Sequence, residues 1–372
     1  MVDKVEIYWG ADQDFEAGIA DIEHPTYMVD IFNHINKTKV KVEGFERDDP
    51  PLEVSDLVIH TDDYGGIKEW ALMGFSNNVL ENLQLKIDNV WLCNPPLLIY
   101  DDIKRTYGNT IIEHKTSYPN ITEDALLKIA TGYSNAVIGQ PHVIQDILPA
   151  IYSLMKKRRS KPATLLFLGT SGIGKTETAN FIGSCIGNGM VRIQFSMQQT
   201  NTAAQYIFGG VHGEDSLARR LIRRNSNLIL LDEFDKVAPG FYNAFYQMFD
   251  EGVFVDKNYR VDVSDCIIIC TSNYLTEEEA ERNLGSAIYS RFTKIIRFEQ
   301  ISPDNRIRIA KEAFLNTMES LDEEERNMVP SEYLLGAYID AINKGAYNNI
   351  RLLRNDIEES VYYEILKAKN IL

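Results

Sequence analysis

The spacing of apolar residues along this chain predicts two kinds of α/β structure followed by a helical end. In the first part, period-two alternation over 83–88 and 39–42 predicts half-buried strands, and 46–51 has the composition of a loop. From residue 136 onward, apolar runs alternate with helical segments, which predicts a parallel sheet covered by helices. The expected strands of this sheet are 165–168, 191–195, 228–231, 266–270 and 294–298.

Residues that cap helices mark the expected domain boundaries. Thr122 is placed to cap a helix over 123–132. Ser302 before Pro303 predicts a strong helix start, because serine caps the first turn and proline fits its first position. The expected C-terminal helices are 302–321, 331–344 and 350–369, with an acidic loop after the first. The expected domains are a separate mixed α/β domain at 1–120, an α/β core at 121–300 and a small helical lid at 301–372.

The most informative motif joins the apolar run 165–168 to a helical segment at 177–187. Glycines let backbone N–H groups turn toward phosphate oxygens, and the helix N-terminus adds its positive dipole. Lys175 is expected to reach the β- and γ-phosphates of a nucleoside triphosphate, and the Thr176 hydroxyl to ligate Mg²⁺. A chance glycine-rich turn is the alternative, which the strand–loop–helix context disfavours. The motif consists of Gly169, Thr170, Ser171, Gly172, Ile173, Gly174, Lys175 and Thr176.

Two acidic residues follow the next long apolar run. The run 228–231 is continuously apolar, as expected of a strand buried on both faces, and it ends in Asp232 and Glu233. A solvated turn is one interpretation. With a phosphate loop upstream, we favour Asp232 as the magnesium residue and Glu233 as the base that polarises the attacking water.

Charge is divided unevenly along the chain. The net charge is −16; residues 1–130 contain 24 acidic and 11 basic residues (−13), which leaves 30 and 27 (−3) for the rest. So acidic a region repels phosphate backbones and disfavours nucleic-acid binding. Its acids, among them Asp12, Asp14, Asp62 and Asp63, are expected to form a solvated face rather than a site.

Composition also bears on the compartment. The sequence has no apolar run long enough for a membrane span and begins without a basic-then-apolar signal pattern. Its four cysteines show no metal-binding spacing. We therefore expect a reducing, cytoplasmic location, no membrane partner and no histidine or cysteine metal site.

Taken in order, several motifs resemble the AAA+ superfamily, specifically the second-ring ATPase domain of Clp-type unfoldases. Besides the phosphate loop and Asp232-Glu233, they are the segment 137–140, a short hairpin over 249–262 and a polar strand that ends in Asn273. The resemblance covers about residues 131–368. It implies an AAA+ phosphate-loop core with a helical lid, ATP and Mg²⁺ as ligands, and a homo-oligomer, expected to be a hexameric ring.

The resemblance also implies roles for individual residues. Val137 and Ile138 would pack on adenine, and Asn273 would orient the lytic water, unless it is only a buried amide in a turn. Arg291 would be an arginine finger that enters the neighbouring subunit's site. Arg351 would be the sensor arginine of the lid, with Arg354 as the alternative because the flanking residues differ from the usual motif.

Two departures from the family limit what the resemblance implies. The segment 207–210 keeps an aromatic residue, Phe208, but lacks the full glycine-aromatic pattern of a substrate-gripping pore loop. Phe208 is thus a pore-loop candidate that could instead pack against its own domain. The stretch between Asn273 and Arg291 is short and lacks the tripeptide that docks a barrel peptidase, so no such partner is expected.

Three functions remain open on the sequence. The favoured one is a ring-forming ATPase that remodels protein substrates chosen by the N-terminal domain. The second is a nucleotide-controlled assembly switch, a scaffold in a mobile-element or defence setting, that threads no polypeptide. The third is a nucleic-acid remodeller, which would need the basic segments 156–159 and 219–224; subunit contacts are the preferred interpretation of those residues.

Overall fold

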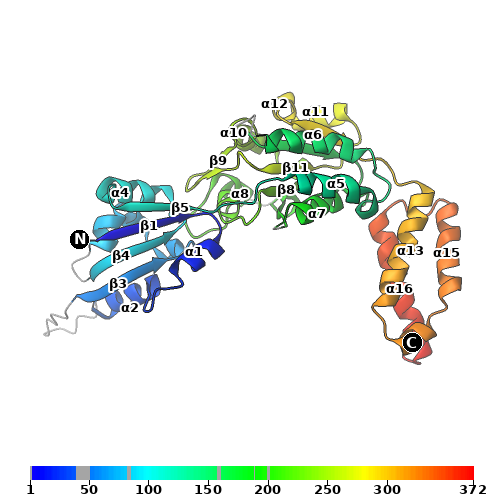
Figure 1. Cartoon of the computed structure of the whole chain (residues 1–372), viewed down its shortest axis with the longest axis horizontal. Helices are drawn as coiled ribbons and strands as arrows, with labels where there is room; N and C mark the ends of the chain where they lie inside the picture. The colour runs from blue at the N-terminus through cyan, green and yellow to red at the C-terminus, as the bar shows by residue number, and fades with distance from the viewer. Residues whose placement is uncertain (1, 39–50, 82–84, 157–160, 188, 199–201) are drawn as a thin grey trace.

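The computed structural model describes residues 2–38, 51–81, 85–156, 161–187, 189–198 and 202–372. Figure 1 shows three parts in a row: an α/β domain in blue and cyan, a second α/β domain in green and yellow, and a helical end in orange and red. The strand predicted at 39–42 lies outside the described residues, as does most of the predicted loop at 46–51.

The N-terminal domain is built on a five-stranded sheet in the order β2-β3-β4-β1-β5, and every neighbouring pair is parallel. The alternation predicted at 83–88 corresponds to the start of β4, of which residues 85–88 are described. The strands are β1 Lys4–Trp9, β2 Thr26–Tyr27, β3 Leu52–Ile59, β4 Leu85–Cys93 and β5 Ile111–Lys115; the helices are α1 Asp12–Ile19, α2 Met28–Thr38, α3 Glu69–Leu72 and α4 Leu97–Tyr107, with shorter turns at Asp63–Gly66 and Ser76–Leu80.

The second domain contains the predicted five-stranded parallel sheet, in the order β12-β6-β11-β8-β7. All six residues of β6 are buried, as expected of a parallel strand covered by helices on both faces. Each predicted strand is present within two residues of its expected bounds. They are β6 Ala163–Leu168, β7 Val191–Gln194, β8 Leu228–Asp232, β11 Ile267–Thr271 and β12 Lys294–Arg297, and the predicted hairpin is the antiparallel pair β9 Val253–Val255 and β10 Arg260–Asp262.

Helices cover both faces of this sheet. The Thr122 hydroxyl accepts a hydrogen bond from the Ala125 amide at 3.1 Å, which confirms the predicted cap. Helix α5 continues past the predicted end, where the ring of Tyr133 packs in the core and is fully buried. The helices are α5 Glu123–Ala136, α6 Val143–Met155, α7 Lys175–Ile186, α8 Ala203–Phe208, α9 Leu217–Ile222, α10 Tyr246–Glu251, α11 Glu277–Leu284 and α12 Ser286–Tyr289, with 3₁₀ turns at Phe195–Gln198, Phe234–Lys236 and Pro239–Phe245.

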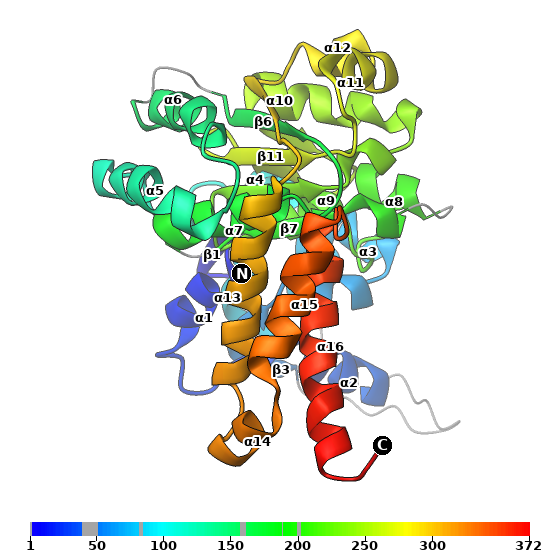
Figure 2. The same ribbon diagram turned by 90° about the vertical axis from the view of Figure 1, so that its right-hand side faces the viewer.

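The C-terminal helices form the lid, with α13, α15 and α16 packed side by side (Figure 2). Ser302 caps α13 as predicted, by accepting a hydrogen bond from the Asn305 amide at 3.3 Å. The predicted acidic loop was wrong in part, because its residues form α14, whose N-cap Asp322 accepts from the Glu325 amide at 2.8 Å. Acidic residues in the first turn stabilise a helix, because their negative charge interacts favourably with the positive end of the helix dipole. The lid helices are α13 Pro303–Glu319, α14 Glu323–Met328, α15 Ser331–Asn343 and α16 Ile350–Ala368.

The two α/β domains meet along a seam of charged side chains. Arg219 of α9 donates to Asp62, and Arg223 donates to Asp12 at 2.7 Å and to Asp62 at 2.9 Å. Asp62 is exposed and Asp12 is partly exposed, as expected of a solvated face, and both also pair with these arginines of the second domain. Within the described residues, no helix is long and apolar enough to cross a membrane.

We predict that a fragment of residues 1–120 folds by itself, because its sheet encloses a hydrophobic core of its own that includes the fully buried Val5, Ile7 and Leu57. A fragment of residues 121–372 is expected to retain ATP binding. Far-UV circular dichroism and thermal unfolding of both fragments test the boundary. One shared unfolding transition in the full chain, together with two insoluble fragments, would contradict it.

Candidate nucleotide-binding site

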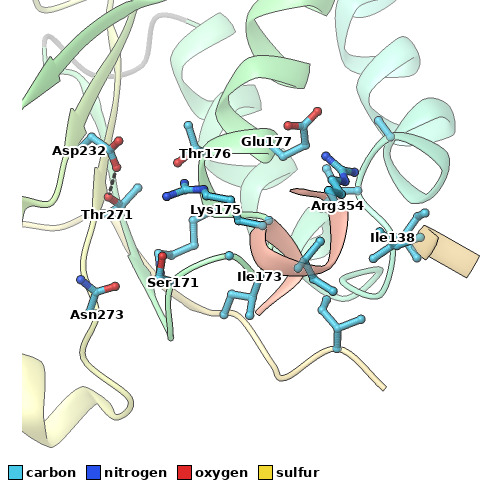
Figure 3. Close-up of a pocket in the computed structure, with 18 of the residues that line it drawn as sticks. Ile138, Ser171, Ile173, Lys175, Thr176, Glu177, Asp232, Thr271, Asn273 and Arg354 are labelled. Atoms are coloured by element: carbon cyan, nitrogen blue, oxygen red, sulfur yellow. Dashed lines mark hydrogen bonds between the residues drawn. The ribbon is translucent and has the colours of Figure 1, made fainter. Parts of the chain in front are cut away.

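A cavity of about 290 Å³ lies at the carboxyl edge of the second sheet, beneath the lid. Because the carboxyl ends of parallel strands meet at one edge, loops that are distant in sequence converge there. Most of the predicted site residues line this cavity: Val137, Ile138, Ser171, Gly172, Ile173, Gly174, Lys175, Thr176, Asp232, Glu233, Asn273, Arg351 and Arg354. Figure 3 shows several of them converging from the phosphate loop, β8, β11 and the lid.

The loop between β6 and α7 has a backbone that requires glycine. The φ angles of Gly169 and Gly174 are 134° and 106°, in a region that residues with a side chain rarely adopt. A Cβ atom at Gly174 would also lie 3.0 Å from a methyl carbon of Val137. These glycines therefore allow the tight turn of the backbone between β6 and the start of α7 at Lys175.

Lys175 is nearly buried at the base of this loop. Its ammonium donates hydrogen bonds to the carbonyl oxygens of Gly169 and, at 2.7 Å, of Thr170. Gly169 and Thr170 do not line the cavity and contribute through these carbonyls. Burial lowers the pKa of Lys175 to about 8, although the nearby Asp235 and Asp232 carboxylates oppose that shift.

Both carboxylate oxygens of Asp232 are held by other side chains. Thr271 donates to Oδ1 at 2.6 Å (Figure 3), and Arg192 donates to Oδ2 from Nε at 3.0 Å and from Nη2 at 2.5 Å. The Thr271 hydroxyl also accepts a hydrogen bond from the Glu233 amide at 2.9 Å. One threonine of β11 therefore positions both acidic residues at the end of β8.

Glu233 adopts an uncommon backbone conformation. Its φ is +55°, in the left-handed region, and Gln194 Nε2 donates to its Oε2 at 3.4 Å. Non-glycine residues in this region are uncommon, and such backbone strain clusters at functional sites. The conformation turns the chain directly after the buried strand, so that Glu233 lines the cavity beside Asp232.

Sequence reasoning did not identify Arg192, Gln194 and Thr271, which also line the cavity. Gln194 lies opposite Asp232 in the register of β7 and β8. Arg192 is two residues earlier, so it shares the same face of β7. Their contacts depend on β7 being next to β8, which the sequence does not specify. Thr271 lay within the motif that ends in Asn273, but only the asparagine was assigned a role.

The segment before α6 is tied to the phosphate loop. Val137 and Ile138 are buried at the cavity wall. The fully buried Gln140 donates to the carbonyl of Ile173 at 3.1 Å and to that of Glu299 at 2.7 Å. This amide connects the apolar pair to the phosphate loop and to the segment that leads into the lid.

Two arginines of α16 reach the cavity from the lid. Arg351 and Arg354 both line it, and Figure 3 shows Arg354 on the side of Ile138. The choice between them as the sensor stays open. Arg291 does not line the cavity of its own chain. It donates to Asp250 at 2.7 Å and stacks on Tyr246, with its guanidinium 4.4 Å from the ring centre.

Phe208, the pore-loop candidate, lies at a helix end and contacts its own domain. It is the last residue of α8, and its ring meets Phe241 edge to face at 5.6 Å. Its carbonyl accepts a hydrogen bond from the Lys257 amide at 2.9 Å, which fastens the helix end to the β9–β10 hairpin. With 39% of its surface exposed, Phe208 is neither free nor a core residue.

Comparisons with known proteins agree with this geometry. Residues 160–318 match the family model of the AAA domain (Cdc48 subfamily). The chaperone ClpB of Malacoplasma penetrans is 25% identical over 339 residues, which are 79% of this chain and 47% of that protein. The Clp protease ATP-binding subunit ClpC of Staphylococcus saprophyticus is 31% identical over 173 residues, which are 43% of this chain and 21% of that protein.

Among solved structures, a chain of Hsp104 in a closed-state cryo-EM reconstruction with ATPγS and FITC-casein aligns with a TM-score of 0.55. The alignment covers 98% of this chain and 89% of that one at 16% identity, so the likeness is one of fold. This chain spans less than half the length of the ClpB and ClpC relatives. Residues 160–318 of this chain are therefore a Clp-type AAA+ ATPase domain, an ATP hydrolase.

Proposed function

We propose that this chain is a subunit of a ring-forming ATPase that uses ATP hydrolysis to remodel proteins selected by its N-terminal domain. The observation that carries the proposal is the cavity in which the phosphate loop, the acidic pair and the lid arginines meet. The matches to ClpB and ClpC support it, as does the fold shared with Hsp104, whose solved complex contains ATPγS and casein.

The residues around the cavity suit ATP with magnesium. Backbone amides of the loop 169–176 and the ammonium of Lys175 would bind the phosphates, while Val137 and Ile138 would pack on the base. The Thr176 hydroxyl and the Asp232 carboxylate would hold Mg²⁺, a cation that prefers oxygen ligands. When bound, the metal would neutralise charge on the phosphate oxygens.

Hydrolysis would depend on groups at the ends of β8 and β11. In this proposal, the Glu233 carboxylate accepts the proton of the attacking water, and the Asn273 amide orients that water. Thr271 keeps the two acidic residues in register through its hydrogen bonds to Asp232 and Glu233. Arg351 or Arg354 would sense the phosphates from the lid.

Ring assembly would complete the site. Arg291 lies outside the cavity of its own chain, which agrees with a role as a finger in the neighbouring subunit. A cation brought to the γ-phosphate stabilises charge in the transition state and raises the rate by ~10³–10⁵. The hexameric number comes from the family resemblance, and a barrel peptidase is not expected as a partner.

One observation favours the assembly switch as a second candidate. The end of α8 and the residues after it are held in place: the carbonyls of Phe208 and Gly210 accept hydrogen bonds from the Lys257 amide and the Asn258 side chain of the hairpin. A chain that threads polypeptide would need this segment to move during the cycle.

Most of the arginines that a nucleic-acid remodeller would need at 219–224 are already bonded to other residues of the chain. Arg219 and Arg223 pair with carboxylates of the N-terminal domain. Arg224 is mostly buried; it stacks on Tyr118 at 4.4 Å and donates to the carbonyl of Asp262 at 2.7 Å. The second basic segment, 156–159, lies mostly outside the described residues. These arginines are therefore engaged within the chain.

Glu233→Gln is predicted to bind ATP and to lose turnover, because an amide keeps the shape of the side chain but accepts no proton from water. Lys175→Ala is predicted to lose ATP affinity instead. Binding of a fluorescent ATP analogue and phosphate release measure the two effects. Glu281→Gln, at an exposed position on α11, is the control for removal of a charge. Equal ATP affinities in the Glu233 and Lys175 variants would contradict the assigned roles.

ATP affinity is predicted to fall as the pH rises through 8. In the free protein the pKa of Lys175 is about 8, and bound phosphates would raise it, so binding takes up a proton above that pH. The expected loss between pH 7 and pH 9 is about tenfold. Titration with the fluorescent analogue measures it. Lys175→Arg stays protonated throughout and is expected to flatten the profile; the same slope in both proteins would rule out Lys175 as its source.

Phe208→Ala is predicted to reduce stimulation of the ATPase by casein while leaving the basal rate unchanged, if the protein threads its substrate. Since the ring makes one edge-to-face contact, the stability loss from that contact is expected to be only ~1 kcal/mol. Thermal unfolding and casein-stimulated phosphate release provide the readouts. Tyr333→Ala, an exposed aromatic on the lid, is the matched control. Unchanged stimulation would favour the assembly switch.

A further inference from the structure

Arg192 and magnesium would compete for the same oxygen of Asp232. Two nitrogens of the Arg192 guanidinium contact Oδ2, while Thr271 holds Oδ1. The side chain of Asp232 is 8% exposed and that of Arg192 is 45% exposed, so the arginine can leave the contact more easily than the aspartate. A metal or its bound water can therefore reach Oδ2 only after Arg192 moves away.

The backbone of Arg192 is tied to helix α9. Arg220 donates from Nη2 to the carbonyl oxygen of Arg192 at 3.3 Å. The same helix carries Arg219, and Arg223 follows its last residue. A shift of α9 would therefore act on the strand position whose side chain holds Asp232.

The N-terminal domain contacts α9 through Arg219 and Arg223. Arg219, itself almost buried, donates to Asp62 and, at 3.1 Å, to the carbonyl of Thr61. Arg223 donates to Asp12 and Asp62. A continuous series of contacts thus leads from the N-terminal domain through α9 to Asp232 in the ATP site.

Two backbone contacts complete the seam. The Leu97 amide, at the start of α4, donates to the Asn258 carbonyl of the hairpin at 2.8 Å. Gly65 packs directly on Gly213, so that a Cβ atom built on Gly213 would lie 2.8 Å from the Gly65 Cα atom. The N-terminal domain therefore covers both the segment before α9 and the tip of the hairpin.

Several buried polar atoms at this seam have no hydrogen-bond partner among the residues that the structure describes. They are Tyr64 Oη, both ring nitrogens of His212, Arg219 Nε, Asn258 Oδ1 and Tyr259 Oη. An unpaired buried polar group is costly, and water would satisfy these atoms if the domains moved apart. Hydration of these atoms would offset part of the free energy lost when the ion pairs break. The cost of separating the two domains would therefore be lower, so that this interface could open and close.

We propose that Arg192 is a positioning residue that couples docking of the N-terminal domain to magnesium binding at Asp232. The proposal rests on the proposed magnesium role of Asp232. With the seam closed, α9 holds the Arg192 backbone, its guanidinium stays on Oδ2, and Mg²⁺ must displace it. With the seam open, Arg192 releases Asp232 more readily. Because coupling between two sites is reciprocal, Mg·ATP would in turn weaken docking.

A single added methyl group tests the coupling in the full chain. Gly213→Ala would drive a Cβ atom into the backbone of Gly65, whereas Gly240→Ala meets no atom within 4 Å and is the control. The Mg²⁺ concentration for half-maximal ATPase activity is expected to fall about fivefold in Gly213→Ala and to stay unchanged in Gly240→Ala. Hydrogen exchange at the Leu97 amide reports whether the seam has opened.

The double mutant separates coupling from a general structural effect. Arg192→Ala is expected to lower the Mg²⁺ requirement by itself, and Gly213→Ala is expected to add nothing in that background. Arg192→Lys keeps a cation at the position and should restore part of the sensitivity to Gly213→Ala. Additive effects of the two changes would overturn the proposal, as would an open seam with an unchanged Mg²⁺ requirement.

Arg223→Glu and Asp232→Asn separate failure of the coupling from failure of the proposed magnesium role. Arg223→Glu places like charges beside Asp12 and Asp62; if neither this variant nor Gly213→Ala raises exchange at Leu97, the seam does not open and the proposal fails. Asp232→Asn tests the underlying function. A Mg²⁺ requirement unaffected by Asp232→Asn would refute the magnesium role itself, whereas an effect there without an effect of the seam variants would refute only the coupling.

Discussion

The parallel direction of the second sheet is the constraint on which the ATP site depends. Since β6, β8 and β11 run the same way, the phosphate loop, Asp232 and Thr271 leave the sheet at one edge. The strands that place them are buried on both faces, so their ends are held with little freedom. Thr271 then locks the end of β8 to the end of β11 through Asp232 and the Glu233 amide. The sheet therefore gives the residues around the cavity rigid support.

The lid depends on the same core. Buried residues of α13, α15 and α16 belong to one hydrophobic cluster with residues of β6 and α5, and the lid helices pack mainly against one another. Arg351 and Arg354 reach the cavity from α16, which packs against α13 and α14. Gln140 strengthens the connection, because it bonds both the phosphate loop and Glu299 just before the lid begins.

Charge explains how the N-terminal domain is attached. That domain contributes most of the negative charge of the chain, and the second domain presents Arg219 and Arg223 to it. Pairs that are partly buried contribute more than exposed pairs, but they lose strength when one partner is removed or hydrated. The polar atoms left unpaired at the same seam make the contact easier to separate than a hydrophobic interface. Packing of Trp9 against the cores of both domains adds an apolar contribution at the seam.

The sequence by itself determined the features that depend on neighbouring residues. The five strands of the second sheet, the phosphate loop and the caps at Thr122 and Ser302 are local patterns of apolar spacing, glycine and hydroxyl groups. A short helix such as α14 and the position of Phe208 at a helix end were missed, since acidic and glycine-rich stretches suit loops equally well.

Tertiary structure alone decided which strands are neighbours and which charges meet. Arg192 reaches Asp232 because β7 pairs with β8. Asp12, at the start of α1, reaches Arg223, at the end of α9, across more than 200 residues of sequence because the two α/β domains meet there. Long-range contacts of this kind leave no periodic signal in the sequence. They follow from the packing of whole helices and strands. Many apolar contacts together determine that packing, and the charged residues that come into contact do not.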